Sequence, residues 1–224
     1  MKIIIILILL TITTMVANAQ YFIEGSVGVR HDDNSYYSVN HHSSPDFFLF
    51  NVLPQVGYCL NDNIAVGTKL SFTYGMRKDM IIDPDDSNQE IERKTKTPEW
   101  RFAIFGRYKL WGTGKLSLLI ETPVGVGGSI RKEQTGTITK KTHSESIVFI
   151  NTFPAIIYDL TDKFSLITAF NFLSLDLSFY SMKLEDTGTK HKGSYFNFNT
   201  QSTIFNSLSG IKIGFIYNFK KSTR

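Results

Sequence analysis

The feature that most constrains the fold of this chain is a tight-turn motif that returns about every fifty residues. In each copy, a run of alternating apolar and polar residues ends in Tyr-x-Leu, and a short polar turn and a new alternating run follow. The copies begin at Tyr58, Tyr108 and Tyr158. A period of two residues is typical of β-strands, and such short turns join antiparallel neighbours. The chain therefore predicts a series of β-hairpins.

The same alternation predicts eight strands over the rest of the chain. We expect them at residues 20–31, 47–60, 63–76, 98–111, 114–130, 146–160, 163–180 and 207–219. Three connections are minimal turns, and we expect the other four to be long polar loops, over 32–46, 77–97, 131–145 and 181–206. Long and short connections alternate, so all the loops would lie at one end. This arrangement is typical of a transmembrane β-barrel.

Two irregularities are expected within these strands. Pro54, Pro123 and Pro154 lie inside predicted strands, where a residue without an N–H favours a bulge. In the strand over 163–180 the apolar residues change face, so we expect a bulge near Phe172 or a strand that extends past the bilayer there.

Residues 1–19 have the pattern of a secretory signal peptide. A lysine precedes an unbroken apolar run, and the small residues Ala17 and Ala19 precede Gln20, so we expect cleavage between Ala19 and Gln20. The alternative is an uncleaved membrane anchor, which the immediate start of a strand at Tyr21 disfavours.

The composition favours a single domain over residues 20–224. Cys59 is the only cysteine, which excludes an internal disulfide. Loss of Lys2 lowers the formal net charge at pH 7 by one, from +4 to +3, which is too small to indicate a nucleic-acid partner. No later apolar run reaches the roughly 20 residues of a membrane helix, so strands would have to do any spanning.

The polar face of the strands indicates which side points to lipid. It mixes small residues with single charges of both signs, which suits the narrow interior of an eight-stranded barrel better than a water-exposed surface. Buried charges require partners, so we expect an interior polar network of Glu24, Arg30, Gln55, Lys69, Arg101, Arg107, Glu121, Asn151, Asp176 and Lys212. We expect Lys212 to pair with Glu24 where the first and last strands meet. Hydration at a lumen mouth is the alternative for Arg30, Lys69 and Asp176.

The opposite faces are apolar and would contact acyl chains. Ile213 and Phe215 are examples on the last strand. At the turn end, an aromatic girdle at the level of the lipid headgroups would consist of Tyr58, Tyr108, Tyr158 and Tyr217.

These features together resemble the porin-like family of eight-stranded outer-membrane β-barrel domains of Gram-negative bacteria. The resemblance rests on the signal segment, the hairpin LPQVGYCLNDNIAVGTKLSF, the strand FAIFGRYKLW and the closing strand GIKIGFIYNF. It implies an all-β, closed, antiparallel, eight-stranded transmembrane barrel in the cell outer membrane, with three short periplasmic turns and four long extracellular loops. It also implies contact with outer-membrane lipid and lipopolysaccharide, and insertion by the barrel-assembly machinery. Phe219 would be the aromatic assembly signal, although residues 220–224 follow it.

The candidate metal sites have unfavourable spacing. His41 and His42 could meet His143 or His191, but adjacent histidines lack the spacing that places two ligands on one ion. The acidic segment 83–92 lacks the glycine and the spacing of an EF-hand loop. We therefore expect no metal and no cofactor.

The sequence leaves several classes of function open. The first is a structural or surface-interaction protein whose loops meet an unknown extracellular partner. Alternatives are a narrow channel for small solutes, an enzyme that modifies lipid A, and a soluble lipocalin-like carrier. A filled lumen favours the first over the channel. The segment His143-Ser144-Glu145 has the residue types of a hydrolase, but consecutive residues of an extended chain point in different directions, so we expect no catalytic residues.

Basic residues cluster near the loop ends of the predicted strands. They would lie beside lipopolysaccharide, whose phosphates they could contact, or would only keep the loops soluble: Arg131, Lys132, Lys140, Lys141, Lys183, Lys190 and Lys192.

Overall fold

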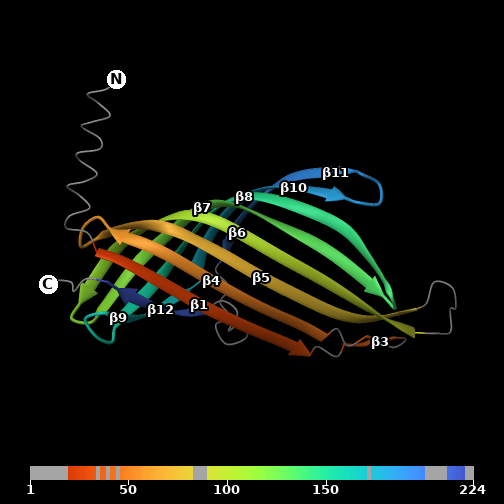
Figure 1. Ribbon diagram of the computed structural model, residues 1–224, viewed down its shortest axis with the longest axis horizontal. Coiled ribbons are helices and arrows are strands. Elements are labelled where there is room, and N and C mark those ends of the chain that lie inside the picture. The colour runs from red at the N-terminus through yellow and green to blue at the C-terminus, as the bar shows by residue number, and fades with distance from the viewer. Residues whose placement is uncertain are drawn as a thin grey trace, which may run out of the picture.

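The computed structural model describes residues 20–33, 36–38, 41–43, 46–82, 90–170, 173–199 and 211–219. Eight of its strands form a closed antiparallel ring (Figure 1). In ring order these are β1 (Gln20–Asp33), β4 (Asp46–Cys59), β5 (Ile64–Ile82), β6 (Glu90–Thr113), β7 (Leu116–Thr135), β8 (Ile138–Asp159), β9 (Phe164–Phe170) and β12 (Ile211–Asn218). β12 pairs with both β1 and β9, and β9 pairs with β8, which closes the ring. The predicted eight-stranded barrel is confirmed, including the meeting of its first and last strands.

The three short turns are confirmed, and two of them share one construction. The Asn61 side-chain oxygen accepts hydrogen bonds from the backbone N–H groups of Asn63 and Ile64, both at 2.8 Å. The Thr161 hydroxyl oxygen likewise accepts from the N–H groups of residues 163 and 164, at 3.2 and 3.0 Å. Gly114 makes the third turn with φ at 53°, a left-handed conformation that glycine adopts without strain. The repeated sequence motif therefore corresponds to a repeated turn structure.

The segments expected to be long polar loops are largely strand, which corrects that expectation. β5 and β6 stay paired as far as Ile82 and Glu90, and β7 and β8 as far as Thr135 and Ile138 (Figure 1). Backbone hydrogen bonds between strands form whether or not one face of the sheet is apolar. A hairpin with water on both faces has no alternation of apolar and polar residues in its sequence. Alternation therefore located the membrane part of each strand and missed its polar continuation.

Two further hairpins lie in the other predicted loops. β10 (Ser174–Leu184) and β11 (Lys190–Asn199) pair with each other inside and beside the range 181–206. β2 (Tyr36–Ser38) and β3 (His41–Ser43) form a short separate hairpin inside 32–46. At one end of the barrel, therefore, paired strands make up much of the segments where the sequence predicts long polar loops.

The predicted strand over 163–180 is divided into β9 and β10. On β8, Thr152 pairs with Leu175 and Ala155 pairs with Ala169, so three residues of β8 (155 minus 152) correspond to six of the other strand (175 minus 169). The difference is an odd number, and an odd insertion in a strand moves its side chains to the opposite face. This accounts for the change of apolar face and places the irregularity where the sequence predicts it. Phe172 itself lies outside the described residues.

No bulge is observed at Pro54 or Pro123, which pair with residues of β1 and β6 in uninterrupted register. Pro154 keeps its register with β7, but its other side lies between Thr152 and Ala155 of β8, opposite the insertion that divides β9 from β10. A proline removes one ladder hydrogen bond, but this loss does not require an extra residue in the strand. In the ladders of the ring strands, register shifts lie instead between Lys109 and Trp111 and between Arg131 and Lys132.

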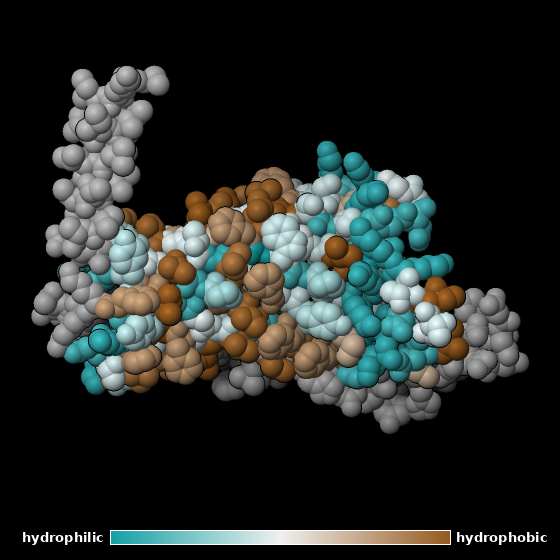
Figure 2. Space-filling view, in the orientation of Figure 1, coloured by the Kyte–Doolittle hydropathy of each residue, from teal (hydrophilic) through white to brown (hydrophobic). Residues whose placement is uncertain are grey.

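The outer surface of the ring is apolar over its middle. Ile213 and Phe215 expose 56% and 62% of their surface on the outside, and the strands around them present side chains of the same kind. Figure 2 shows a hydrophobic belt across the middle of the face of the barrel in view. The predicted orientation, with apolar side chains outward, is confirmed. Among the described residues, no helix is both long and apolar enough to cross a membrane.

We predict that Ile213→Arg lowers the free energy of unfolding by about 2–4 kcal/mol, because it places a charge against the middle of the acyl chains. The measurement is a urea titration of protein refolded into lipid vesicles. Thr139→Arg, on the exposed polar part of β8, is the control and should change stability little. Equal losses in the two variants would contradict the outward orientation of Ile213.

Candidate functional site: the polar network in the lumen

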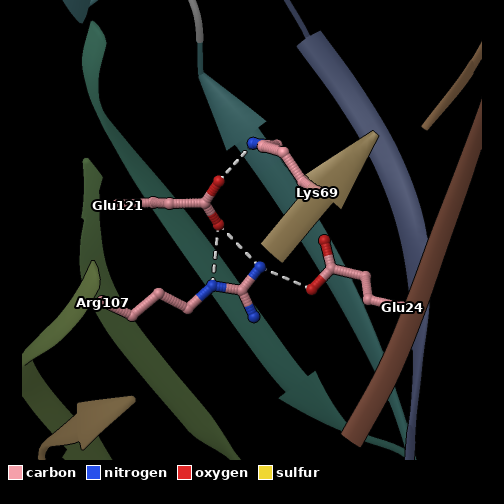
Figure 3. A network of polar contacts seen from close by, with 4 residues as sticks. All are labelled: Glu24, Lys69, Arg107 and Glu121. Atoms are coloured by element: carbon pink, nitrogen blue, oxygen red, sulfur yellow. Dashed lines mark hydrogen bonds and ion pairs between the residues drawn. The ribbon is translucent and has the colours of Figure 1, made fainter. Parts of the chain in front are cut away.

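The lumen contains a compact network of four charged residues from four strands. Glu24 comes from β1, Lys69 from β5, Arg107 from β6 and Glu121 from β7, and all four point to the same region of the interior (Figure 3). Arg107 Nη2 lies 2.5 Å from Glu24 Oε2 and 2.6 Å from Glu121 Oε2. Arg107 Nε donates a second hydrogen bond to Glu121 at 2.7 Å, and Lys69 Nζ donates to the other oxygen of Glu121.

The network is buried and electrically balanced. The side-chain exposures are 5% for Arg107, 8% for Glu24, 2% for Glu121 and 14% for Lys69. Two cations face two carboxylates, so these four side chains carry no net charge. Desolvation of ions is costly, and only close pairing with hydrogen bonds offsets that cost. Each member therefore depends on the presence of the others.

Phenylalanine rings enclose the two cations. The Arg107 guanidinium carbon lies 5.2 Å from the ring centre of Phe22 and 5.0 Å from that of Phe105. Lys69 Nζ lies 5.2 Å from the ring centre of Phe153. Cation–π attraction of this kind adds to the ion pairs and excludes water from them.

Sequence reasoning missed these rings. Phe22 precedes Glu24 by two residues and Phe105 precedes Arg107 by two, so both lie on the polar face of their strands. An aromatic residue at a polar-face position was the signal that could have identified them. The interior is therefore a mixture of charges and rings, not only of charges and small residues.

Glycines make room for the rings. A Cβ atom at Gly57 would lie 2.1 Å from the Phe22 ring, and one at Gly67 would lie 2.5 Å from the Phe105 ring and 2.3 Å from the carbonyl oxygen of Val56. A neighbour at such a distance must move, and a backbone atom cannot do so cheaply. The small residues of the polar face thus set where the rings lie.

Other predicted members of the network take different places. Gln55 is buried, stands opposite Glu24 and Lys69 in the sheet, and lines a cavity of about 30 Å³ beside the network. Asn151 donates a hydrogen bond to Asp176, which also accepts one from Ser174 at 2.9 Å. These contacts form a second polar group on β8 and β10.

Three predicted members of the network remain: Arg101, Arg30 and Lys212. Arg101 is partly exposed, pairs with Glu99 and lies 5.3 Å from the ring centre of Phe149. The side chains of Arg30 and Lys212 are outside the described residues. The expected pairing of Lys212 with Glu24 therefore stays a prediction, and among the described side chains Arg107 takes that role.

A cavity of about 670 Å³, which we call the funnel, lies at the turn end of the barrel. Its lining includes Lys109, Lys115 and Asp159, with Phe22 and Arg107 among its innermost residues. The network and its rings therefore separate this funnel from the small cavity beside Gln55.

Aromatic side chains surround the outside of the same end. Tyr108 and Tyr158 are exposed, and Tyr58 and Tyr217 are partly exposed. Tyr58 contacts Tyr21 with ring centres 5.2 Å apart, and Tyr217 contacts Phe164 and Phe219 at 5.0 and 5.2 Å. The predicted girdle thus has further aromatic members at positions adjacent to it.

The candidate reactive residues do not come together. Ser144 donates to Glu185 at 3.1 Å, Glu145 accepts from Ser129 at 3.4 Å, and a His143 ring nitrogen lies 3.1 Å from Arg131. Three consecutive side chains thus contact three different partners. Among the described residues, no group of three or more His, Cys, Asp or Glu side chains could hold a metal ion. The side chains of His41 and His42 and the segment 83–89 lie outside the described residues.

The sequence matches no family model and no curated protein. Similar solved structures include a major outer membrane protein from Thermus thermophilus (12% identity, TM-score 0.47, covering 90% of this chain and 100% of that one). Another is Neisserial surface protein A (10% identity, TM-score 0.35, covering 90% of this chain and 99% of that one). A third is Ail, the attachment invasion locus protein of Yersinia pestis (11% identity, TM-score 0.34, covering 89% of this chain and 94% of that one).

The fold is that of the eight-stranded outer-membrane β-barrel proteins. This assignment rests on the closed strand ring and the apolar belt described above, and such a belt fits the cell outer membrane.

We predict that Gly67→Ala destabilises the barrel by about 1–3 kcal/mol, because the added methyl group meets backbone and the Phe105 ring. Gly106→Ala is the matched control, since a Cβ at Gly106 meets nothing within 4 Å. The measurement is the free energy of unfolding in vesicles. A Gly67→Ala variant as stable as Gly106→Ala would show that the interior is loosely packed.

We predict that Arg107→Met lowers the free energy of unfolding by about 3–5 kcal/mol, because it leaves Glu24 and Glu121 buried with one cation. Arg131→Met, at an exposed position, removes the same charge and should have a small effect. The two variants are compared by urea titration in vesicles. Similar losses of unfolding free energy in the two variants would mean that Arg107 contributes no more to stability than an exposed arginine does.

Proposed function

We propose that this protein is an outer-membrane barrel with a closed lumen, whose role is structural or lies in contacts made by its extracellular hairpins. The observation that carries the proposal is the neutral, aromatic-enclosed network of Glu24, Lys69, Arg107 and Glu121 across the lumen. An eight-stranded barrel is just wide enough for its side chains to fill, and here they fill it with ion pairs.

The cavities support a closed lumen. The funnel of about 670 Å³ has Arg107 and Phe22 at its inner limit, and the cavity beyond the network is about 30 Å³. A volume of that size holds about one water molecule. A solute would have to separate buried ion pairs to pass, so the narrow-channel alternative requires a rearrangement of the most strongly paired residues in the interior.

The apolar belt disfavours the soluble-carrier alternative. A soluble protein rarely exposes a large continuous apolar surface, whereas lipid covers such a surface at no cost in a membrane. The outward exposure of residues such as Ile213 and Phe215 therefore supports a location in the bilayer.

The extracellular end offers a defined surface for a partner. The hairpins β5–β6, β7–β8 and β10–β11 are paired strands, and side chains connect them. Glu185, after β10, accepts from Ser144 of β8 at 3.1 Å and lies 2.9 Å from Lys141 Nζ. The hydrogen bond from Lys141 lowers the pKa of Glu185 below its usual range, and the hydrogen bond from Ser144 lowers it further. A surface held in this way suits contact with an extracellular partner, and the proposed role involves no catalytic step.

The end of β12 supports the proposed route of insertion. The N–H of Phe219 donates to the carbonyl oxygen of Tyr21 at 3.0 Å, so this aromatic residue lies beside the first strand at the seam of the barrel. We propose Phe219 as the residue that the barrel-assembly machinery reads.

We predict that purified protein in a planar lipid bilayer shows no steady single-channel openings, because the network blocks the lumen. The double variant Arg107→Ala with Glu121→Ala, which removes the centre of the block, should conduct measurably if it folds, as judged by heat-modifiable gel migration. Arg131→Ala with Glu133→Ala, outside the membrane part of β7, is the control and should stay closed. Steady openings in the unaltered protein would overturn the proposed closed lumen.

A further inference from the structure

The funnel at the turn end of the barrel has the size of a ligand site. Its volume of about 670 Å³ lies within the roughly 300–1,000 Å³ that small-molecule sites occupy. Arg107, with its ion pairs to Glu24 and Glu121, lies at its inner limit, so a molecule that enters from the turn end is stopped there. The funnel is therefore a blind cavity, and neither the closed lumen nor the extracellular hairpins of the proposed function assign it a role.

The inner part of the funnel is apolar. Phe22, Leu119 and Ile216 line it, and each of them belongs to the buried hydrophobic cluster of the interior. Cys59 and Ile157 also line it and pack against the same cluster. Walls of this kind favour the transfer of an apolar group out of water. The inner part therefore suits a ligand with an apolar body.

The outer part of the funnel carries charges of both signs. Lys109 of β6 and Lys115 of the second turn line one side. Asp159, at the end of the neighbouring strand β8, accepts a hydrogen bond from the Ser165 hydroxyl at 2.8 Å, and Asp62 lies in the first turn. A head group with a single charge is attracted by one set of these side chains and repelled by the other. A head group that carries both an ammonium and a carboxylate is attracted by both sets.

Both lysines of the funnel can accept a carboxylate partner. Among the described residues neither Lys109 nor Lys115 makes an ion pair, in contrast to five other lysines: Lys69, Lys78, Lys94, Lys141 and Lys183. The segments that adjoin Gln20 and Phe219 at this end, residues 1–19 and 220–224, contain no aspartate or glutamate. They therefore supply no acidic side chain to the funnel.

Hydrogen bonds between neighbouring hairpins fix the mouth of the funnel. The N–H of Lys109 donates to the carbonyl oxygen of Asn63 at 2.8 Å, which joins the first turn to β6. The N–H of Asp159 donates to the carbonyl oxygen of Lys115 at 2.9 Å, which joins the second turn to β8. A cavity whose walls are formed before a ligand enters loses little conformational freedom on binding. The mouth therefore holds its charged groups ready for a ligand.

We propose that the funnel binds small zwitterionic amphiphiles, which are molecules with an apolar body and adjacent ammonium and carboxylate groups, as in an apolar amino acid. The apolar body lies against Leu119 and Ile216. The carboxylate accepts charge-assisted hydrogen bonds from Lys109 and Lys115, and the ammonium group lies on the side of Asp159. This inference goes beyond the proposed function, because it gives the barrel a ligand at its turn end, which is the periplasmic end on the proposed topology.

The test measures the binding of four probes to the refolded protein in lipid nanodiscs, which leave both ends of the barrel open to water. The probes have similar hydrocarbon chains and differ in head group: 2-aminooctanoic acid is zwitterionic, octanoic acid anionic, 2-aminooctane cationic and 2-octanol neutral. Calorimetric titration gives the affinities, and empty nanodiscs correct for partition into lipid. We expect 2-aminooctanoic acid to bind at least about tenfold more tightly than each of the other three.

The cysteine of the funnel reports where the probe binds. Cys59 is the only cysteine of the chain and lines the funnel, so a water-soluble maleimide that enters from the turn end can alkylate it. We expect 2-aminooctanoic acid, at about ten times its Kd, to slow this alkylation about tenfold, as followed by intact mass. An unchanged rate would place the probe outside the funnel and overturn the proposal.

Two double variants separate the funnel from general charge. Lys109→Met with Lys115→Met should weaken the binding of 2-aminooctanoic acid at least about tenfold without weakening that of 2-aminooctane, because only the carboxylate loses its partners. The control, Lys132→Met with Lys140→Met, removes the same charge from the hairpin end of β7 and β8 and should keep both affinities. Equal affinity of the unaltered protein for all four probes, or equal losses in the two double variants, would contradict the proposed ligand.

Failure of the funnel would be distinguishable from failure of the proposed function. Both double variants should still migrate as heat-modifiable barrels and should not conduct, because the four substituted lysines lie outside the network in the lumen. A missing preference for the zwitterionic probe concerns the funnel alone. Steady conductance of the unaltered protein concerns the closed lumen, whichever probe binds.

Discussion

The ion pairs of Arg107 with two buried carboxylates are the interaction on which the interior depends. Closing eight strands into a ring leaves a lumen that only side chains can fill, and here the side chains that meet at its centre include Glu24 and Glu121. Without a central cation these carboxylates would be buried against each other. The guanidinium resolves this with hydrogen bonds in two directions, and the Phe22 and Phe105 rings keep water from it. The strand pairing that closes the ring therefore also brings together the side chains that close the lumen.

The residue types on the outer surface of the barrel change along the strands, because the surroundings change between lipid and water. The middle is apolar where it meets acyl chains, the turn end carries aromatic rings, and the hairpin end carries lysines on six neighbouring strands. In the ladder of β5 with β6, strand pairing continues through all three zones without interruption. The barrel wall is therefore one sheet that passes from lipid into water, and the hairpins that extend from it are as ordered in their pairing as the part in the membrane.

Much of this could be read from the sequence, and the errors have identifiable causes. The turns after Tyr58, Tyr108 and Tyr158, the number of strands and the outward face all follow from alternation, which reports a difference between two faces. Alternation gives no signal where water contacts both faces of a strand, so it does not predict the strand continuations toward Ile82 and Thr135. A proline within a strand does not by itself predict a bulge, since loss of one N–H does not shift the register. The phenylalanines of the interior were missed because polar-face positions were expected to hold only small or charged residues.

The sequence by itself determined which residues face inward, because a period of two assigns every side chain of a strand to one side. It could not determine which inward charges meet. Glu24 and Arg107 lie 83 residues apart in the chain and on strands that are not neighbours in the ring, and they come together only because the ring closes at a particular register. Register and the insertion that divides β9 from β10 are properties of paired strands. Pairing depends on the whole sheet, so only the tertiary structure decided them.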